Sequence, residues 1–243
     1  RYIPKYSLSN WGVLQTTAMC AAYVWFREFL PKDIEEWAWS ELANQLDLQI
    51  LEDGAHWEQS AMYHVEVLNT CTKLFIHMKN AQAVDWELSE EALEAINEIS
   101  QWDDEKEAHA YPGEGMRRKE AGWLVSAIRV LNRHVLYTAD PSWKQLPQCD
   151  SDVTDVKDVM VRAAVILQGG GIYRYAAGKH LELDSVFLLG APGIDRFEKT
   201  NPYIPLHSSW ICQDAGNIFF RTKWGKDANF TWVKNSTLGS GHG

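Results

Sequence analysis

The spacing of apolar residues changes about two thirds of the way along the chain, and this change most restricts the fold. Before Gly171, apolar residues recur every three or four positions, the spacing of one buried face of an α-helix. After Gly171, two short segments at 218–222 and 230–233 are rich in β-branched and aromatic residues. The stretch between them has the composition of a hairpin turn. The sequence therefore predicts helices followed by antiparallel strands.

Helix start and stop signals divide the first part of the chain further. Pro31 ends the first helix, and Asp33 is expected to cap the second. Helices of this length, joined by polar loops, favour antiparallel pairs and an α/α toroid. We therefore predict a mainly α fold, an incomplete toroid over 1–170, then a linker and the first strands of an antiparallel β-sandwich over 171–243. The expected helices cover 11–30, a segment from Asp33, a segment from Ser60, 90–99, 118–137 and 155–167. The inward face of the first helix is expected to carry Leu14, Ala18, Ala21, Trp25 and Phe29.

Charge and hydropathy exclude two classes of protein. The formal net charge is −10, and a general nucleic-acid binder would need a basic face for phosphate. No apolar stretch approaches the roughly 20 residues of a membrane span. The four cysteines form no CxxC pair, so they predict buried thiols, not a zinc framework, and leave the compartment open. The 12 tryptophans fill a core or line a groove where sugar rings stack.

Polar residues gather in the segment Asp53–His64, where a turn leads into a helix. This segment holds His56, Glu58, Gln59, Tyr63 and His64 within three helical turns. His64 shares a stripe with apolar residues, so it is expected to point inward, as a hydrogen-bonded core histidine or as a functional group. The spacing is not the HExxH of zinc proteases.

Three other segments carry polar or glycine-rich patterns. Residues 148–155 are acidic, which suits a helix start and lacks the calcium-loop pattern. Residues 169–171 are three glycines without a phosphate-loop motif, so they predict a helix stop. His242 lies between glycines and is expected in a disordered end or a tight turn.

Several motifs together resemble the heparinase II/III superfamily. They run in the same order over nearly the whole chain, and the last two are the most specific: Asn10-Trp11, Asp53-Gly-x-x-x-Glu-Gln-Ser-x-x-Tyr-His64, Asp150-Ser-Asp-x-Thr-Asp155, Gly216-Asn-x-x-x-Arg-x-x-Trp-Gly-x-Asp-Ala-Asn229 and Leu238-Gly-Ser-Gly-His-Gly243. The resemblance implies an α/α toroid and a β-sandwich with the active site in the cleft between them. It also implies a polysaccharide lyase that cleaves heparin-like, heparan-sulfate-like or alginate-like uronic-acid polymers by β-elimination. In such a reaction a base removes the C5 proton, an acid protonates the leaving oxygen, and side chains neutralise the uronate carboxylate.

The resemblance also implies roles for individual residues. His64 matches the histidine that neutralises the carboxylate or takes the proton, and Gln59 substitutes for an asparagine that relatives have nearby. Tyr111 and Tyr137 are the alternatives for the catalytic acid. His242 matches an active-site histidine of the β domain. Zinc ligands of relatives would follow Gly243, so we expect no cofactor in this chain and a zinc ion only in a full-length β domain.

An acidic polysaccharide or oligosaccharide is the expected partner, with no nucleic acid and no membrane span. The expected substrate-binding residues are Trp57, Glu58, Gln59, Tyr63, Arg117 and Trp143, with Trp123 also near the cleft. Two alternatives stay open: a glycan-binding protein on the same scaffold, and a hydrolase that uses Glu58 with Asp150 or Asp152. The chain is expected to be a fragment or a partial record, and inactive by itself.

Overall fold

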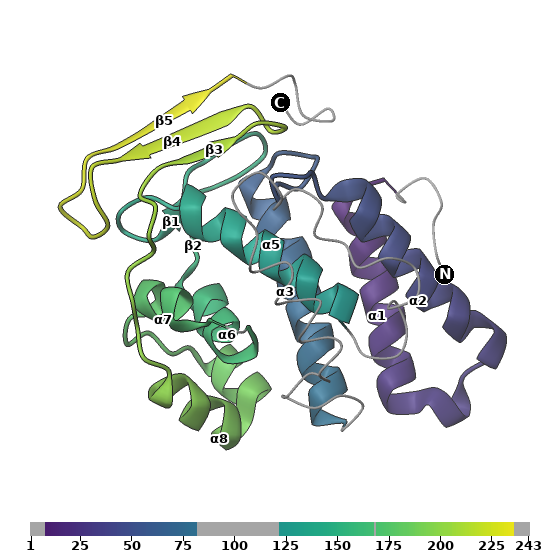
Figure 1. Cartoon of the computed structure of the whole chain (residues 1–243). Coiled ribbons are helices and arrows are strands. Elements are labelled where there is room, and N and C mark those ends of the chain that lie inside the picture. The colour runs from purple at the N-terminus through teal and green to yellow at the C-terminus, as the bar shows by residue number, and fades with distance from the viewer. Residues whose placement is uncertain (1–7, 82–121, 168, 236–243) are drawn as a thin grey trace. The chain divides into compact units, whose positions relative to one another are not determined.

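The computed structural model describes residues 8–81, 122–167 and 169–235 (Figure 1). The chain divides into two compact units. The N-terminal unit comprises Arg1–Glu52 and Glu66–Val130, and the C-terminal unit comprises Asp53–Val65 and Leu131–Gly243. Each unit is described by itself below. The expected helix at 90–99 lies outside the described residues.

The N-terminal unit is helical in its described part. It holds α1 (Asn10–Phe26), a short 3-10 helix η2 (Arg27–Phe29), α2 (Lys32–Gln49) and most of α3 (Ala61–Asn80). The first half of α5 (Gly122–Thr138) also belongs to it. Apolar side chains on α1, α2 and α3 are fully buried: Val13, Cys20, Ala38, Leu42, Leu46, Leu68, Cys71 and Leu74.

The inward face of α1 differs from the expected one. Trp25 is 48% exposed and Phe29 is 84% exposed, and Ala18 is exposed as well. Thr16 and Thr17 are buried instead, because their hydroxyls donate to the backbone carbonyls of Gly12 and Val13 at 2.8 Å. A threonine hydroxyl that bonds one turn back exposes no unsatisfied group, so the helix face it lies on can be buried. The expected inward face was wrong for this reason.

The starts of α2 and α3 follow two different patterns. The N-cap of α2 is Pro31, without a side-chain cap, and Asp33 lies in the first turn where its charge favours the positive helix end. The expected cap was therefore two residues late. In α3 the backbone N–H of Tyr63 donates to Ser60 Oγ at 3.4 Å, so the expected start at Ser60 is confirmed.

Helices continue in the C-terminal unit through the segment that was expected to be a linker. These are α6 (Lys157–Ile166), α7 (Gly171–Ala177) and α8 (Leu183–Lys199), which bends at Gly190. Every residue of α6 from Val159 to Ile166 is buried. The segment after 171 therefore contains two helices before the strands begin, and the two domain ranges stay a prediction.

The glycines before α7 allow a close approach of the chain. Tyr203 donates from its hydroxyl to the Gly169 carbonyl at 2.9 Å. A Cβ on Gly171 would lie 2.4 Å from the Tyr203 ring. The glycine run thus separates α6 from α7 and makes room for an aromatic side chain.

Two antiparallel sheets complete the C-terminal unit. The first is the pair β1 (Lys144–Gln145) and β2 (Thr154–Asp155). The second has the order β3 (Trp210–Cys212), β4 (Asn217–Arg221) and β5 (Phe230–Lys234), which Figure 1 shows side by side. The predicted hairpin is confirmed, with Phe219 opposite Trp232. β3 was not expected, because three residues are too short for a periodic pattern.

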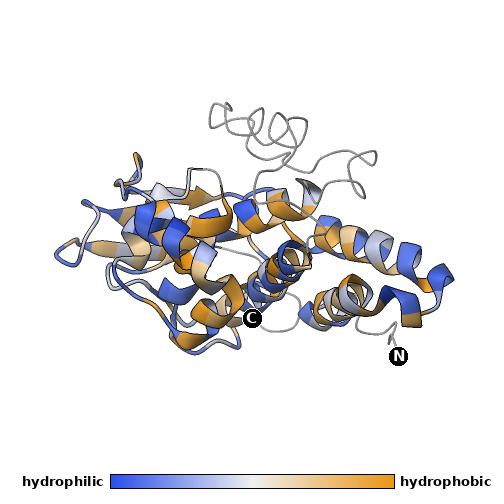
Figure 2. Ribbon diagram, turned by 90° about the horizontal axis from the view of Figure 1, so that it is seen from below, coloured by the Kyte–Doolittle hydropathy of each residue, from blue (hydrophilic) through white to orange (hydrophobic). Residues whose placement is uncertain are grey.

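The described helices carry both apolar and polar residues, as the hydropathy colours of Figure 2 show. None of them is both long and apolar enough to cross a membrane. Cys20, Cys71 and Cys212 are buried free thiols and Cys149 is half-buried, which confirms the expectation of unpaired thiols for these four residues.

Candidate functional site

The loop before α3 is fixed to the turn between β3 and β4. Gly54 has a φ of +83°, which a turn with a left-handed residue requires. Asp53 accepts two backbone N–H groups, from Ala55 at 3.0 Å and from Ala215 at 2.8 Å. One carboxylate thereby joins segments that are 162 residues apart.

His64 lies at the start of α3 and is 4% exposed. Its Nδ1 accepts from the backbone N–H of His56 at 3.2 Å, and its Nε2 lies 3.0 Å from the Leu131 carbonyl. Because Nδ1 faces a donor and Nε2 faces an acceptor, we assign the proton to Nε2. Both ring nitrogens are therefore engaged, and the expected inward orientation of His64 is confirmed.

Two more buried histidines lie next to His64. The ring of His134, on α5, is 4.8 Å from that of His64, and His134 Nδ1 is 3.8 Å from Cys212 Sγ. Burial, with a smaller contribution from a neighbouring histidine, lowers the pKa of His56 and of His64 to about 3. Burial also lowers the pKa of His134 to about 4, although a hydrogen bond to the Asp53 backbone raises it. All three imidazoles are thus neutral at pH 7.

A pocket of about 30 Å³ opens beside these histidines, about two to three times the smallest cavity that holds a water molecule. Its lining comes from the loop before α3 and the start of α3, the second half of α5, β1 and the segment after it, and the β3–β5 sheet with its first turn. The residues are Ala55, His56, Gln59, Ser60, Ala61, His64, His134, Thr138, Gln145, Leu146, Gln148, Ala215, Asn217, Phe219 and Trp232. We call it the histidine pocket.

Three amide groups of the histidine pocket have atoms without partners among the described residues. Gln59 Oε1 and Gln148 Nε2 are buried and make no hydrogen bond there. Asn217 accepts from Trp232 Nε1 at 3.0 Å through Oδ1, and its Nδ2 has no partner in the described part of the chain. Gln59 also has a φ of +55°, a conformation that costs of order 1 kcal/mol in a residue with a side chain. One acceptor and two donors are therefore available to a ligand.

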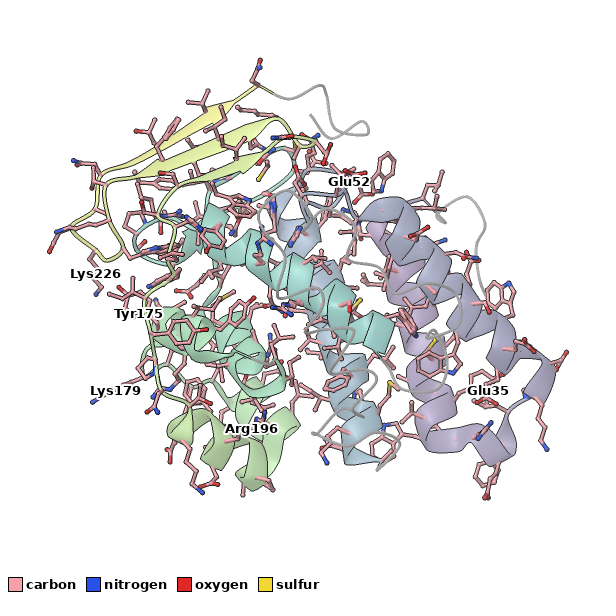
Figure 3. All side chains as sticks on the ribbon, viewed as in Figure 1. Glu35, Glu52, Tyr175, Lys179, Arg196 and Lys226 are labelled. Atoms are coloured by element: carbon pink, nitrogen blue, oxygen red, sulfur yellow. The ribbon has the colours of Figure 1, made fainter. Side chains whose placement is uncertain are left out.

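Tyr137 lies on α5 in a group of stacked rings. Its ring lies on Trp210, with centroids 4.6 Å apart, and meets Trp224 edge-on at 5.7 Å. Trp224 in turn stacks on Trp143 at 5.6 Å, and Tyr175 of α7, labelled in Figure 3, meets Trp143 edge-on. We call these five residues the aromatic cluster.

Two arginines lie over the aromatic cluster. The guanidinium carbon of Arg133 is 4.2 Å from the Trp210 ring centre, and that of Arg221 is 4.5 Å from the Trp224 ring centre, at the range of cation–π attraction. Burial lowers the pKa of Arg221 to about 10, although Asp140 and Tyr137 raise it. Arg221 therefore remains charged beside Tyr137.

Trp143 is held in an unusual backbone conformation. Its φ is +64°, which is uncommon for a bulky residue. The Asp140 carboxylate accepts the backbone N–H groups of Ser142 and Lys144 at 2.8 and 2.9 Å. This turn fixes the indole ring against Trp224.

Glu58, Tyr63 and Asp150 form a third set. Burial raises the pKa of Tyr63, and Asp150 and Glu58 raise it further, so both carboxylates lie near the phenol. Glu58 is 1% exposed, and its Oε2 is 3.8 Å from His56 Nδ1. Since His56 is neutral at pH 7, this contact is not an ion pair.

The predicted site residues therefore fall in different places. Gln59 and His64 line the histidine pocket, Glu58 and Tyr63 lie beside them, and Tyr137 and Trp143 lie in the aromatic cluster. Trp57 is half-buried in the loop before α3. Trp123 is buried in the N-terminal unit. Tyr111, Arg117 and His242 lie outside the described residues.

Sequence reasoning missed several residues that the structure brings to these places. His134, Gln148 and Asn217 line the histidine pocket, and Arg221 and Trp224 belong with the aromatic cluster. A signal was present for most of them, because Asn217, Arg221 and Trp224 all belong to the Gly216–Asn229 motif.

A family model decides how the chain is classified. The model of the heparinase II/III N-terminus matches residues 1–133, more than half of the chain. The chain belongs to the heparinase II/III family. No curated protein matches it.

Two solved structures of a heparinase III, described as the BT4657 gene product, are similar to the chain. One has a TM-score of 0.58 at 17% identity, and the other, with methylated lysines, has a TM-score of 0.53 at 14% identity. In both cases 95% of this chain is covered but only 28% of the solved chain. Together with the observed elements, this likeness confirms the expected fold class, helices of an α/α toroid followed by the first strands of a β-sandwich.

Proposed function

We propose that the chain forms part of a lyase that cleaves uronic-acid-containing polysaccharide by β-elimination. Membership of the heparinase II/III family supports a polysaccharide-lyase scaffold. The chain spans 28% of the length of the solved heparinase III structures, so the activity and substrate of the whole protein belong to the proposal.

The histidine pocket is the observation that carries the proposal. Two motif segments, Asp53–His64 and Gly216–Asn229 with the strand after it, both contribute to its walls. Gln148 Nε2 and Asn217 Nδ2 are N–H donors without partners in the described residues. A uronate carboxylate accepts such donors, and fixed donors stabilise the enolate that forms after C5 deprotonation. Each well-placed donor is worth about 3 kcal/mol of barrier.

In this proposal His64 and Tyr137 keep the roles that the resemblance implies. Neutral His64 takes the C5 proton or donates to the carboxylate. The first requires its hydrogen bond from the His56 amide to break, and the second its hydrogen bond to the Leu131 carbonyl. Tyr137 protonates the leaving oxygen. The charged Arg221 nearby stabilises the phenolate that remains. Tyr111 is the alternative acid.

The distribution of charge removes an objection to an anionic substrate. The C-terminal unit has 12 Lys and Arg against 13 Asp and Glu, a net charge of −1. The N-terminal unit has 11 against 20, a net charge of −9. The field at a site depends on nearby charges more than on the total, and the unit that holds the histidine pocket is nearly neutral.

The test is to incubate the full-length protein with heparan sulfate, hyaluronan, alginate and ulvan, and to follow the ultraviolet absorbance of the unsaturated uronate. We expect a rise for at least one polymer. The rate at which the absorbance rises should fall at least about 100-fold in Gln148→Ala if the Gln148 amide donates a hydrogen bond to the transition state. Gln213→Ala is the matched control, because Gln213 is an exposed glutamine in the β3–β4 turn.

Three results would contradict the proposal. New reducing ends without the absorbance would indicate a hydrolase. Binding without any product would indicate a glycan-binding protein. Equal rates in Gln148→Ala and Gln213→Ala would show that the histidine pocket takes no part in the reaction. The 243-residue chain is assayed alongside and is expected to be inactive.

A further inference from the structure

Three side chains that commonly bind metal ions meet in the C-terminal unit, away from the residues that line the histidine pocket. Asp158 lies in the first turn of α6, His180 in the connection between α7 and α8, and Glu182 at the N-cap of α8. One ligand atom from each lies within 4.8 Å of the others. Lys179, labelled in Figure 3, directly precedes His180 and marks the place.

His180 and Glu182 contact each other directly, through a hydrogen bond that a shared ion would have to replace. His180 Nε2 is 2.9 Å from Glu182 Oε1. Two ligands of a tetrahedral zinc ion, each about 2.1 Å from the metal, are about 3.4 Å apart. An ion between these two atoms therefore needs them to separate by about half an ångström. The Asp158 carboxylate, within 4.8 Å of both, is the third ligand.

Asp158 is oriented by two further residues. Its Oδ1 accepts from Ser185 Oγ and its Oδ2 from Arg162 Nη1, both at 2.5 Å. Carboxylate oxygens have additional lone pairs, so these bonds leave acceptor capacity. Hydrogen bonds of this kind hold metal-ligating carboxylates in position.

The local charge favours a cation. Asp158, Glu182 and Asp184 supply three carboxylates, and Arg162 is the guanidinium that contacts Asp158 and, at 3.5 Å, Asp184. Three carboxylates and one guanidinium together carry a charge of −2. The side chains of His180 and Glu182 are 28% and 55% exposed, so an ion can reach them from solvent.

We propose that Asp158, His180 and Glu182 bind a divalent transition-metal ion, with zinc as the ion that this donor set fits. One imidazole and two carboxylates suit zinc, with water as the fourth ligand. Calcium needs six to eight oxygen ligands and magnesium a near-octahedral shell of oxygens, so neither fits this set. The site joins the first turn of α6 to the N-cap of α8, and its role is to stabilise the helices. It does not depend on the proposed lyase activity.

Calorimetric titration of the metal-free 243-residue chain with zinc chloride tests the proposal. We expect one zinc ion per chain and a rise in the melting temperature of about 5 °C at a zinc concentration of 100 times Kd. His180→Ala and Glu182→Gln should each weaken this binding at least about 10-fold. Magnesium and calcium chloride should give no saturable binding.

His207→Ala is the matched control, because His207 is an exposed histidine of the same unit and not a member of this group. It should bind zinc like the unaltered chain. Circular dichroism checks that His180→Ala and Glu182→Gln keep their helices. Glu182→Gln changes an exposed side chain to one of the same shape, so it tests the site even if His180→Ala does not fold. The proposal is wrong if no one-to-one zinc binding is seen, or if both site variants bind zinc like the unaltered chain. It is also wrong if His207→Ala weakens zinc binding as much as the site variants do.

Discussion

Acidification from about pH 7.5 to about pH 5 should destabilise the chain through the buried histidines His56, His64 and His134. In the folded protein, burial lowers the pKa of His56 and His64 to about 3 and that of His134 to about 4. In the unfolded chain a histidine titrates near 6.5. Below that pH the unfolded state binds more protons than the folded state, so the free energy of unfolding falls as the pH falls.

The size of the effect follows from these values. The loss begins near pH 6.5 and continues until the folded-state pKa values of about 3 to 4 are reached. At pH 5 a histidine that stays neutral when folded lowers the free energy of unfolding by about 2 kcal/mol. Three independent histidines would give about 6 kcal/mol, an upper limit because the rings of His64 and His134 are in contact.

Urea unfolding followed by tryptophan fluorescence measures the effect at both pH values. His134→Gln removes one titrating ring, so its loss between the two pH values should be smaller than that of the unaltered chain by about 2 kcal/mol. His64→Gln repeats the test at a second ring. His207→Ala, the change of an exposed histidine, should leave the loss unaltered. An equal pH dependence in all four proteins would refute the reasoning, because carboxylates alone would then account for the acid sensitivity.

Other changes test the packing of the C-terminal unit by the midpoint of urea unfolding. Gly171→Ala should cost about 2 kcal/mol, since its Cβ would overlap the Tyr203 ring. Gly178→Ala, whose Cβ meets open space at a φ of +61°, should cost only about 1 kcal/mol, and equal costs would argue against the close approach. Trp143→Gly should be more stable than Trp143→Ala by about 1 kcal/mol, because glycine adopts the positive φ without strain; the reverse order would contradict the assigned turn. Asp53→Ala should cost about 3 kcal/mol through two lost charge-assisted hydrogen bonds, whereas a neutral result would show that the loop before α3 does not need this anchor.

Periodicity predicted α1, α2, α3, α5, α6 and the β4–β5 hairpin because each is long enough to show a repeat. It failed for the inward face of α1, because hydropathy treats Thr16 and Thr17 as polar although their hydroxyls bond to the helix backbone. It also missed α7, which has seven residues, and α8, which Gly190 and Pro192 interrupt. A short element such as α7 is fixed by tertiary packing, here around the glycines before it, and not by a local pattern.

The composition of the candidate site was predictable only in part. The inward position of His64 followed from its stripe on α3, and the family resemblance singled out the Gly216–Asn229 motif. Which residues line one pocket depends on contacts between distant segments, and a single sequence does not encode these in any local pattern. Gln148 illustrates this, since its neighbours suggested only a helix start, whereas its amide lies in the histidine pocket.

The Asp53–Ala215 hydrogen bond has a consequence for how the chain is made. The ribosome releases Asp53 long before Ala215, 162 residues later, and closing so large a loop is slow. Until β4 emerges, the three histidines lack the sheet that buries them, and the nascent helices expose apolar surface to chaperones or to other chains. Expression at low temperature or with chaperones should therefore raise the soluble yield, and a stop before residue 215 should lower it more than a stop after β5.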